Sequence, residues 1–484
     1  MNLKPVVSIL GFLVFGTGVA MLFPIPFSLF YGDDDVLAFV FASIASIAVG
    51  LVFWLGYRSR DREEDILHVK EGYLVVTFGW FFCSLFGSLP LLLSGTSPSF
   101  TDAFFEIVSG FTTTGASVID DVEKLPHGIL FWRSMTQWLG GMGIIVLSLA
   151  ILPLLGVGGM QLFKAEVVGP TKDKLAPRIA ETARLLWGVY LIISGAETIL
   201  LLFGGMSLFD ALCHMFATVA TGGFSTRNHS IGQFESSYIE WVVTIFMFLA
   251  GTNFALHLRA LRGNLTGYRK NNEFVFYSAI LLVGIVVLAT LNIMGEVADA
   301  PTSVRLAAFQ VVSITTTTGF NTANYQTWLP SSQVIIFFLM FFGGCAGSTG
   351  GSIKHIRLLL LLRTGINELK KLIHPKAVLV VRHNGHAVPQ EILINIVGFV
   401  VLYIALFLLC SILMSLVGLD FITATSAVAA TLGNVGPGLG SIGPWETYAQ
   451  LPLLGKWISI ACMLLGRLEL FTVLVIFSAA FWRK

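Results

Sequence analysis

The sequence predicts an all-α polytopic membrane protein, and three observations carry this prediction. Of 484 residues, 55% are hydrophobic and 12% are charged, and the mean hydropathy is +0.82, whereas soluble domains carry about 25% charged residues. Ten apolar stretches are long enough to cross a bilayer, which takes about 20 helical residues. Four shorter apolar stretches between them end in threonine and glycine, which predicts four re-entrant half-helices. The ten predicted spans are 5–30, 36–57, 71–94, 130–155, 184–206, 237–258, 273–295, 332–361, 390–417 and 456–482.

The first predicted span begins the chain and has the apolar character of a signal peptide. Its sequence is "MNLKPVVSILGFLVFGTGVAMLFPIPF", which is too long for the apolar core of a typical signal. No clear small-x-small cleavage site follows it. We therefore expect a retained transmembrane helix here.

The positive charges predict the orientation of the ten spans. Of the 29 Lys and Arg residues, 23 lie in six segments that share one side if the chain crosses ten times. Lysine and arginine concentrate on the cytoplasmic side of membrane proteins, so both termini are predicted to be cytoplasmic. The net charge of +1 gives no electrostatic argument for binding nucleic acid. The six segments are Lys4, Arg58–Lys70, Lys164–Arg184, Arg259–Lys270, Lys354–Arg382 and Arg483–Lys484.

The four predicted half-helices share a pattern that indicates an internal fourfold repeat. Three of them place an aspartate (Asp102, Asp210, Asp420) 13 residues before a glycine, and the third in chain order lacks the aspartate. In that copy Phe309 stands ten residues before its glycine, as Phe105 does in the first copy. The second copy leaves open whether Gly222 or Gly223 is equivalent. The aligned glycines are Gly115, Gly223, Gly319 and Gly433, at intervals of 108, 96 and 114 residues.

These threonine and glycine stretches are predicted to form a cation filter. One alternative is four unrelated extracellular loops, which the equal spacings disfavour. Irregular backbone persists in a membrane only where it is buried in protein or lines a water-filled cavity. Rings of carbonyl oxygens can replace the hydration shell of an ion, and uncharged oxygens suit a large monovalent cation better than a divalent one. The predicted filter residues are Thr112, Thr113, Thr114, Gly115, Val219, Ala220, Thr221, Gly222, Gly223, Thr316, Thr317, Thr318, Gly319, Thr431, Leu432, Gly433 and Asn434.

The segment "GGCAGSTGG" (343–351) interrupts the predicted span 332–361. Small residues can also serve close helix packing, which is the alternative. Five glycines with a serine and a threonine in nine residues disfavour a continuous helix, so a broken helix beneath the filter is predicted. The residues concerned are Gly343, Gly344, Gly347, Ser348, Thr349, Gly350 and Gly351.

Arg467 lies inside the last predicted span, too far from either end to reach an interface easily. Glu469 is two residues further on and does not share its helix face. We expect Arg467 to face the cavity below the filter, where it would slow cations or hold the broken segment by hydrogen bonds. The alternative is a static buried ion pair.

Several other polar residues are assigned supporting roles. We expect Arg133 and Gln137 to brace a half-helix, and His257 to be a structural hydrogen-bonding residue. The acidic residues at the half-helices fit ordinary capping and could also concentrate cations at a pore mouth. These acidic residues are Asp102, Glu106, Asp210 and Asp420.

Five further stretches contain distinctive motifs. They are "WRSMTQWLGGMGIIVL" (132–147), "GTNFALHLRALRGN" (251–264), "GGCAGSTGGSIKHIRL" (343–358), "TLGNVGPGLG" (431–440) and "GRLELFT" (466–472). These motifs resemble the bacterial Trk potassium-uptake subunit of the TrkH/TrkG type, in the Trk/Ktr/HKT superfamily.

The resemblance implies four M1–P–M2 units around a pseudo-fourfold pore for K⁺, preceded by two extra helices. It implies a gate at the 343–351 segment, a homodimer in the bacterial inner membrane, and a cytoplasmic ring of nucleotide-binding, TrkA-like regulatory subunits. The expected divisions are 1–70 for the N-terminal extension and 71–183, 184–272, 273–389 and 390–484 for the four units.

No cofactor is expected on this chain. A G-x-G-x-x-G at Gly438–Gly443 follows no strand, so it is interpreted as a turn after the fourth half-helix. Four histidines (His355, His374, His383 and His386) lie in the basic segment 354–389 without a supporting thiol or carboxylate cluster. That segment and Lys164–Arg184 are predicted to form the surface on which the regulatory ring docks.

The sequence allows three classes of function to be compared. A channel-like potassium transporter is favoured, and a proton- or sodium-coupled symporter is the alternative, which intramembrane acids would support. An intramembrane hydrolase, and with it an enzymatic function, is disfavoured because no H-E-x-x-H, paired intramembrane aspartates or G-x-S-x-G occurs in the sequence.

Overall fold

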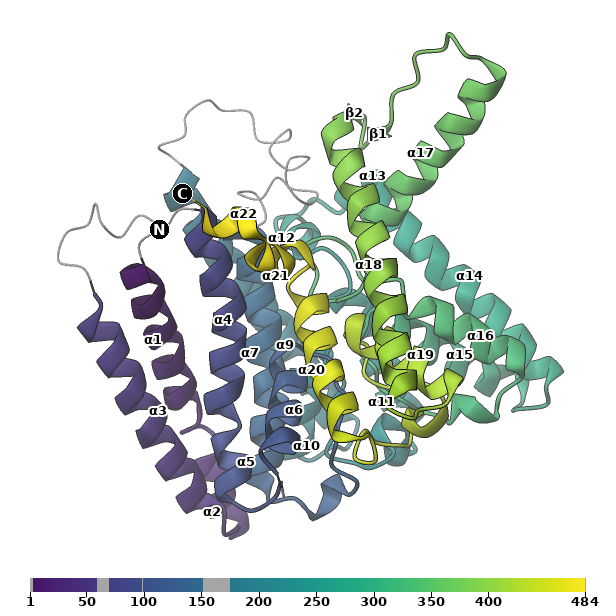
Figure 1. Ribbon diagram of the computed structural model, residues 1–484. Coiled ribbons are helices and arrows are strands. Elements are labelled where there is room, and N and C mark those ends of the chain that lie inside the picture. Colours follow the sequence, from purple (N-terminus) through teal and green to yellow (C-terminus); the bar gives the residue numbers. More distant parts are fainter. Residues whose placement is uncertain (1–2, 59–68, 98, 151–174, 484) are drawn as a thin grey trace.

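The computed structural model describes residues 3–58, 69–97, 99–150 and 175–483, which are mainly helical. Long apolar helices run side by side through most of the molecule (Figure 1). A helix satisfies its backbone hydrogen bonds within itself, which makes it the stable form of an apolar segment in lipid. The long helices are α1 (Leu3–Ala20), α3 (Val36–Gly56), α4 (Val69–Gly87), α7 (His127–Ala150), α9 (Leu175–Phe203), α14 (Asn272–Met294) and α18 (Gln390–Leu416).

Six helical segments of the described chain are long and apolar enough to cross a membrane, or eight if each of two sharply bent helix pairs is one span. This agrees with a polytopic α-helical membrane protein. The predicted count of ten stays a prediction. The predicted span 130–155 corresponds to α7 but ends outside the described residues, and the predicted span 332–361 is divided into two helices.

The predicted span 237–258 is bent rather than straight. It consists of α11 (Ser237–Ala250) and α12 (Phe254–Leu261), which meet at 101°. The bend has a local cause, because Gly251 ends the first helix and the Asn253 side chain caps the second by accepting a hydrogen bond from a backbone N–H.

The last predicted span, 456–482, is also bent, so the expectation of one continuous helix is wrong. Its two parts, α20 (Leu453–Arg467) and α21 (Phe471–Leu474) with the following 3₁₀ turn, meet at 107°. Glu469 and Leu470 between them have φ of 58° and 35°, which ends the right-handed helix. Arg467 is therefore the last residue of a helix and not a residue inside one.

The predicted break in the span 332–361 is confirmed. Helix α16 (Pro330–Leu339) and helix α17 (His355–Ile373) are separated by non-helical residues 340–354, called here the intramembrane segment. It includes the glycine-rich stretch 343–351.

Four short helices occupy the positions of the predicted half-helices. Each begins where a side chain or proline favours a helix start: Ser99, Ser207 and Asp420 accept a backbone N–H from the first turn, and α15 has a proline there. These helices are α6 (Phe100–Phe111), α10 (Leu208–Val219), α15 (Ala300–Thr315) and α19 (Phe421–Leu432).

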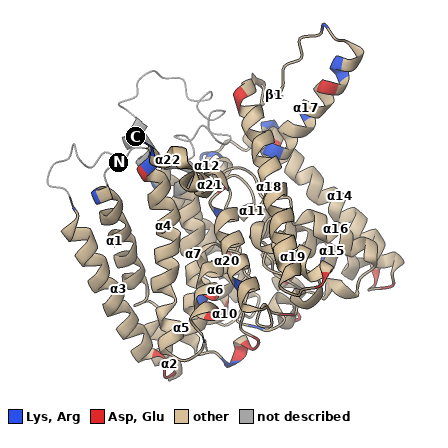
Figure 2. Cartoon of the chain, viewed as in Figure 1, with Lys and Arg blue, Asp and Glu red and all other residues tan. Residues whose placement is uncertain are grey.

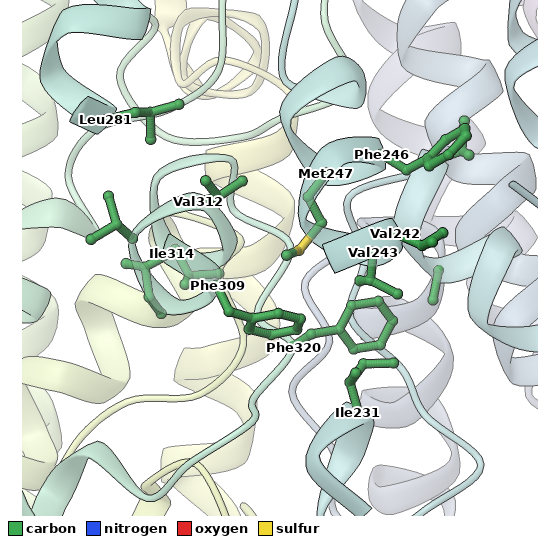
Figure 3. Packing of buried hydrophobic residues seen from close by; sticks show 14 of the residues in the cluster. Ile231, Val242, Val243, Phe246, Met247, Leu281, Phe309, Val312, Ile314 and Phe320 are labelled. Atoms are coloured by element: carbon green, nitrogen blue, oxygen red, sulfur yellow. The ribbon is translucent and has the colours of Figure 1, made fainter. Parts of the chain in front are cut away.

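Apolar side chains fill the space between the short helices and the long ones. Figure 3 shows Phe309 and Val312 of α15 beside Val243 and Met247 of α11, with Phe320 between the two groups. Among helices in lipid, such contacts act by van der Waals packing, because lipid tails are as apolar as the side chains. This packing fixes where the C-terminal ends of the short helices lie.

Both chain ends lie at the same end of the helices, and α17 projects beyond the other helices there (Figure 1). Charged residues gather mostly at the two ends of the helices (Figure 2). The remaining elements are α2 (Ile25–Tyr31), α5 (Leu89–Leu93), α13 (Thr266–Lys270), α22 (Ala479–Trp482), the 3₁₀ turns Val122–Lys124, Ser230–Phe234, Tyr325–Thr327, Gly440–Ile442 and Val475–Phe477, and an antiparallel pair of β1 (Arg382–His383) and β2 (His386–Ala387).

Candidate functional site

The chain makes the same turn after each of the four short helices. In each turn a non-glycine residue is left-handed, and two residues later a glycine also has positive φ. The left-handed residues are Thr113, Thr221, Thr317 and Asn434, with φ of 52°, 54°, 61° and 54°. The glycines are Gly115, Gly223, Gly319 and Gly436, with φ of 80°, 79°, 81° and 99°.

The hydrogen bonding of the four turns repeats as well. In every copy the N–H of the residue before the glycine donates to the carbonyl five residues earlier, in the last turn of the short helix. The bonds are Thr114 to Ser109 (2.8 Å), Gly222 to Ala217 (2.7 Å), Thr318 to Ser313 (2.8 Å) and Val435 to Ala430 (2.7 Å). Four distant segments thus adopt one backbone conformation.

The four turns close into a ring. A Cβ added to any of the four glycines would overlap the carbonyl oxygen of the residue that precedes the next glycine in the ring. The pairs are Gly115 with Gly222, Gly223 with Thr318, Gly319 with Val435, and Gly436 with Thr114. Glycine is required twice at these positions, for its positive φ and for the absence of a side chain.

The fourth copy corrects the sequence alignment. The glycine of the ring is Gly436, whereas Gly433 is right-handed (φ −80°) and caps the end of α19. Thr431 and Leu432 are still helical. The cause is that Asp420 is itself the N-cap of α19, whereas the aspartates of the first two copies lie three residues after a serine N-cap. Counting from aspartate therefore shifted this copy by three residues.

The alignment of the second copy, which the sequence left open, is given by the backbone: Gly223 and not Gly222 has positive φ. Gly222 instead supplies the carbonyl that faces Gly115. Threonine hydroxyls near the ring bond to one another, with 2.8 Å between the Thr112 and Thr114 hydroxyls and 2.8 Å between those of Thr316 and Thr318. The hydroxyls thus stabilise the turns.

A cavity of about 330 Å³ lies against the ring, and all four glycines line it. Asp120, Glu446 and Arg227 are among its other lining residues. The aspartates of the short helices have partners: Asp102 pairs with Lys456 (2.6 Å) and Asp210 with Arg227 (3.2 Å). Asp102 and Asp210 are not N-caps but accept hydrogen bonds from the hydroxyls of the N-cap serines, and only Asp420 caps its helix directly.

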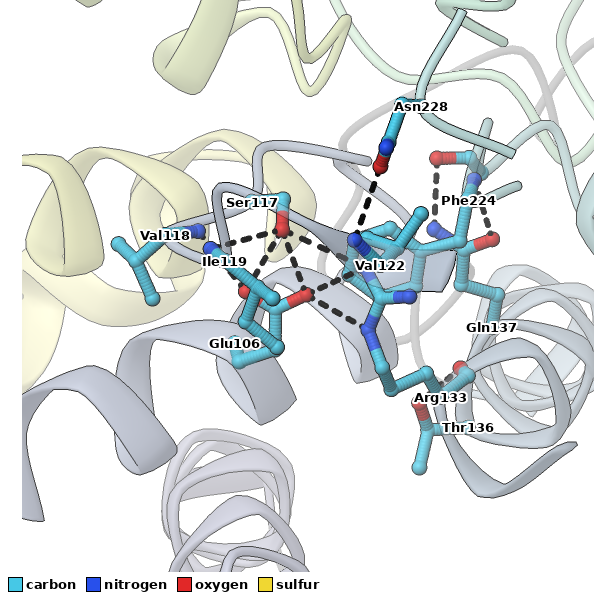
Figure 4. A network of polar contacts seen from close by, with 11 residues as sticks. Glu106, Ser117, Val118, Ile119, Val122, Arg133, Thr136, Gln137, Phe224 and Asn228 are labelled. Atoms are coloured by element: carbon cyan, nitrogen blue, oxygen red, sulfur yellow. Dashed lines mark hydrogen bonds and ion pairs between the residues drawn. The ribbon is translucent and has the colours of Figure 1, made fainter. Parts of the chain in front are cut away.

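Arg133 of α7 braces the half-helix α6, as predicted, whereas Gln137 of α7 braces the second turn of the ring and not a half-helix. Arg133 forms a buried ion pair with Glu106 of α6 (2.6 Å), and Glu106 also accepts hydrogen bonds from Ser117 and the Val118 N–H (Figure 4). Gln137 bridges the second turn, donating to the Gly222 carbonyl (2.6 Å) and accepting from the Phe224 N–H (3.0 Å).

Gln137→Leu should weaken ion discrimination moderately while the protein stays folded. The Gly222 carbonyl and the Phe224 N–H would lose their buried partner, at a cost of about 1–3 kcal/mol for each unsatisfied group. The relative permeability of cations in liposomes measures this effect. Gln137→Glu keeps the acceptor for the Phe224 N–H but loses the donor to the Gly222 carbonyl, so it should also weaken discrimination. An unchanged permeability ratio in Gln137→Leu would show that the brace is dispensable.

The intramembrane segment lies against the side of the ring facing α17. The Gly351 N–H donates to the Thr317 hydroxyl (2.7 Å), and a Cβ at Gly350 would lie 3.0 Å from the Thr316 carbonyl oxygen. The Thr349 hydroxyl lies between the carbonyls of Val219 (3.1 Å) and Ala250 (3.2 Å) and can donate its proton to either. A Cβ at Gly351 would lie 3.0 Å from the Cβ of Asn434, so the segment contacts the third and fourth turns and the ends of α10 and α11.

Arg467 reaches the same segment. It is 2% exposed, and its Nη1 donates to the Thr349 carbonyl at 2.7 Å. Its Nη2 lies 3.5 Å from the Gly140 carbonyl on α7. Glu469 pairs instead with Arg357 of α17. Among the described residues Arg467 contacts backbone carbonyls, so the alternative of a static buried ion pair is not supported.

Glu273 at the start of α14 was missed by the sequence analysis. Its carboxylate accepts N–H groups from the intramembrane segment and from α17. An acidic residue at the start of a strongly apolar span was the only signal for Glu273 in the sequence.

Among the described residues no three His, Cys, Asp or Glu side chains gather in a metal-binding group. Lys164–Arg184, part of the predicted docking surface, lies mostly outside the described residues.

The structure also tests the predictions for His257 and for the stretch Gly438–Gly443. Both ring nitrogens of His257 are bonded, to the Tyr268 hydroxyl (2.7 Å) and the Leu249 carbonyl (2.9 Å), which confirms a structural role. The stretch Gly438–Gly443 forms a tight turn in which the Gly438 N–H donates to the Ile442 carbonyl. A three-residue 3₁₀ turn, not the start of a long helix, lies within it.

Long apolar helices around a ring of four similar turns define the class, a polytopic α-helical membrane protein. The chain belongs to the TrkH family of cation transport proteins, whose sequence model matches residues 37–484.

Named relatives match over their full length. The chain is 43% identical to the Trk system potassium uptake protein TrkH of Halomonas elongata and 42% identical to that of Escherichia coli K12, each covering 100% of both chains. It is 35% identical to TrkG of Escherichia coli K12, covering 100% of this chain and 99% of the relative. The crystal structure of the potassium transporter TrkH from Vibrio parahaemolyticus superposes with a TM-score of 0.92 at 39% identity, covering 100% of both chains.

Proposed function

We propose that this protein takes up K⁺ through a channel-like pore whose selectivity filter is the ring of four turns. The observation that carries the proposal is the closed ring, in which each glycine faces a carbonyl of the next turn. Carbonyl oxygens held in this way replace the hydration shell of a weakly hydrated monovalent cation. The names of the relatives, which are potassium uptake proteins, support K⁺ as the ion.

In this proposal four M1–P–M2 units surround the pore with pseudo-fourfold symmetry, following an N-terminal extension of residues 1–70. The units are 71–183, 184–272, 273–389 and 390–484. The filter consists of Thr112–Gly115, Ala220–Gly223, Thr316–Gly319 and Gly433–Gly436. The repeated backbone geometry of the four turns supports this arrangement.

The intramembrane segment and Arg467 are proposed to gate the pore. The segment contacts two turns of the ring, and Arg467 holds it through the Thr349 carbonyl. A pathway leading away from the ring on this side would be obstructed by the segment and would pass a fixed positive charge. Opening then requires the segment to move and its hydrogen bonds to exchange for others.

The proposed setting is a homodimer in the lipid of the bacterial inner membrane, with both termini in the cytoplasm. A cytoplasmic TrkA-like ring of nucleotide-binding subunits would act on α17, which projects at the end where both termini lie (Figure 1). The relatives are named as parts of a Trk system, which supports a further component. No cofactor is proposed for this chain itself.

One observation favours the alternative, a proton- or sodium-coupled symporter. Glu197 on α9 is 0% exposed. Its carboxyl group lies close to the Thr218 hydroxyl but has no hydrogen bond of normal geometry within the described part of the chain. An isolated charged carboxylate is costly at such a site, so the group is a possible carrier of a coupled proton.

Flux into liposomes separates the two functions. A channel-like pore should move K⁺ down its electrochemical gradient in the absence of a proton or sodium gradient, and Glu197→Gln should leave this flux unchanged. A symporter requires the second gradient for accumulation. Flux that appears only with a proton gradient, and is lost in Glu197→Gln, would overturn the channel proposal.

A further inference from the structure

Glu273 lies where three parts of the structure meet. It is the second residue of α14 and is 4% exposed. Its Oε1 accepts the N–H of Ala346 in the intramembrane segment (2.7 Å) and the N–H of Ile356 in the first turn of α17 (3.1 Å). One buried carboxylate thus joins α14, the segment and α17.

The bond to Ile356 replaces a missing cap. The N-cap residue of α17, Lys354, makes no side-chain cap hydrogen bond, so the first N–H groups of this helix need acceptors from elsewhere. Glu273 supplies one of them, and its negative charge is favourable at a helix N-terminus. The position of α17 and that of Ala346 therefore depend on the same side chain.

The next residue of α17 is tied to the other side of the segment. Arg357, 4% exposed, pairs with Glu469 and lies over the Phe399 ring, 3.9 Å from its centroid. Glu469 follows Arg467 by two residues, and Arg467 holds the Thr349 carbonyl. Consecutive residues at the start of α17 thus connect to the segment near Ala346 and near Thr349.

We propose that Glu273 is a positioning residue that couples α17 to the intramembrane segment, so that a displacement of α17 is passed to the residues beneath the ring. This inference rests on the proposed gating role of the segment. It assigns the coupling to a defined contact: the shared carboxylate between the Ala346 and Ile356 N–H groups. The outer part of α17 is exposed, including Leu369 and Leu372, so a partner can reach the helix that Glu273 connects to the segment.

A native cysteine reports on the segment. Cys345, next to Ala346, is 1% exposed, whereas Cys213 and Cys462 are fully buried in other elements. Alkylation of the full-length protein with a small charged maleimide, resolved by site with mass spectrometry, separates release of the segment from general unfolding. Release exposes Cys345 alone, and unfolding exposes all three.

Glu273→Asp keeps the charge but is one methylene shorter, so it cannot hold both N–H groups in the present geometry. We expect the alkylation rate of Cys345 to rise roughly tenfold in Glu273→Asp and further in Glu273→Ala, with Cys213 and Cys462 still protected. Glu197→Gln is the matched control, because it alters a buried carboxyl group that has no bond to the segment, and it should leave the Cys345 rate unchanged.

A double-mutant cycle tests the coupling itself. Arg357→Ala loosens the first turn of α17 and should raise the Cys345 rate. In the Glu273→Asp background its effect should be clearly smaller, because the tie from α17 to Ala346 is already cut. Independent, multiplicative effects would overturn the coupling. An unchanged Cys345 rate in Glu273→Asp, or an equal rise in Glu197→Gln, would overturn the role of Glu273.

Potassium flux from the same preparations keeps this inference separate from the proposed function. If Cys345 becomes accessible in Glu273→Asp without any rise in flux, Glu273 positions the segment but the segment is not the gate. If Cys345 stays protected, the inference about Glu273 fails whatever the flux. If Glu273→Ala exposes all three cysteines, that variant has unfolded. The role of Glu273 is then decided by Glu273→Asp and by the double-mutant cycle.

Discussion

Gly436→Ala should remove most of the preference for K⁺ over Na⁺. A Cβ at this position would overlap the Thr114 carbonyl oxygen, and alanine is strained at the φ of 99°. The carbonyl would turn or the ring would open, and the geometry that replaces the hydration shell would be lost. We expect the permeability ratio of K⁺ to Na⁺ to fall by about tenfold or more, equivalent to about 1.4 kcal/mol.

Gly418 provides a matched control for this substitution. Its φ of 101° is nearly the same, but a Cβ there would meet nothing within 4 Å. Gly418→Ala therefore carries the same backbone strain without touching the ring, and it should leave the ratio unchanged. Gly433→Ala tests the register, since Gly433 is right-handed and a Cβ there would lie 2.9 Å from the Met340 carbonyl oxygen, which is not a carbonyl of the ring. A larger loss of selectivity in Gly433→Ala than in Gly436→Ala would contradict the ring described here.

Arg467→Ala should raise cation flux by more than tenfold without changing selectivity. A cation about 7 Å from the guanidinium is repelled by about 2.4 kcal/mol at an effective dielectric constant near 20, which corresponds to a slowing of roughly fifty-fold. The substitution also frees the Thr349 carbonyl, which loosens the intramembrane segment. Selectivity is set by the ring and should be retained.

Arg467→Lys separates the two causes. Lysine keeps the charge but loses the planar fork that reaches the carbonyls of Thr349 and Gly140. Low flux in Arg467→Lys would show that the barrier is electrostatic, and flux equal to that of Arg467→Ala would show that the hydrogen bonds hold the gate closed. If both variants conduct like the unmodified protein, Arg467 has no part in gating.

Some features could be predicted because they depend on local chemistry. The stretch 343–351 contains so many glycines that no helix is stable there, and the structure has none. The bend at Glu469 and Leu470 could not be predicted, because neither residue type favours a left-handed conformation and no glycine or proline follows Arg467 in the sequence.

The error at Gly433 has an equally definite origin. Asp102 and Asp420 are the same residue type near the start of similar helices, but Asp420 caps its helix and Asp102 lies three residues inside. Spacing measured from aspartate therefore differs by three residues between copies. Counted from the N-cap residue of the short helix, the glycine of the ring follows 16 residues later in the first, second and fourth copies.

By itself, the sequence determined the membrane class, the turns of the first and third copies, and the break in the span 332–361, because hydropathy and backbone propensity act over a few neighbouring residues. Only the tertiary structure decided which glycine completes the ring, which carbonyl each glycine faces, and that Glu273 joins two distant N–H groups. The facing residues in the ring are at least 95 positions apart in the chain, and such contacts arise from the packing of whole helices and leave no local pattern in the sequence.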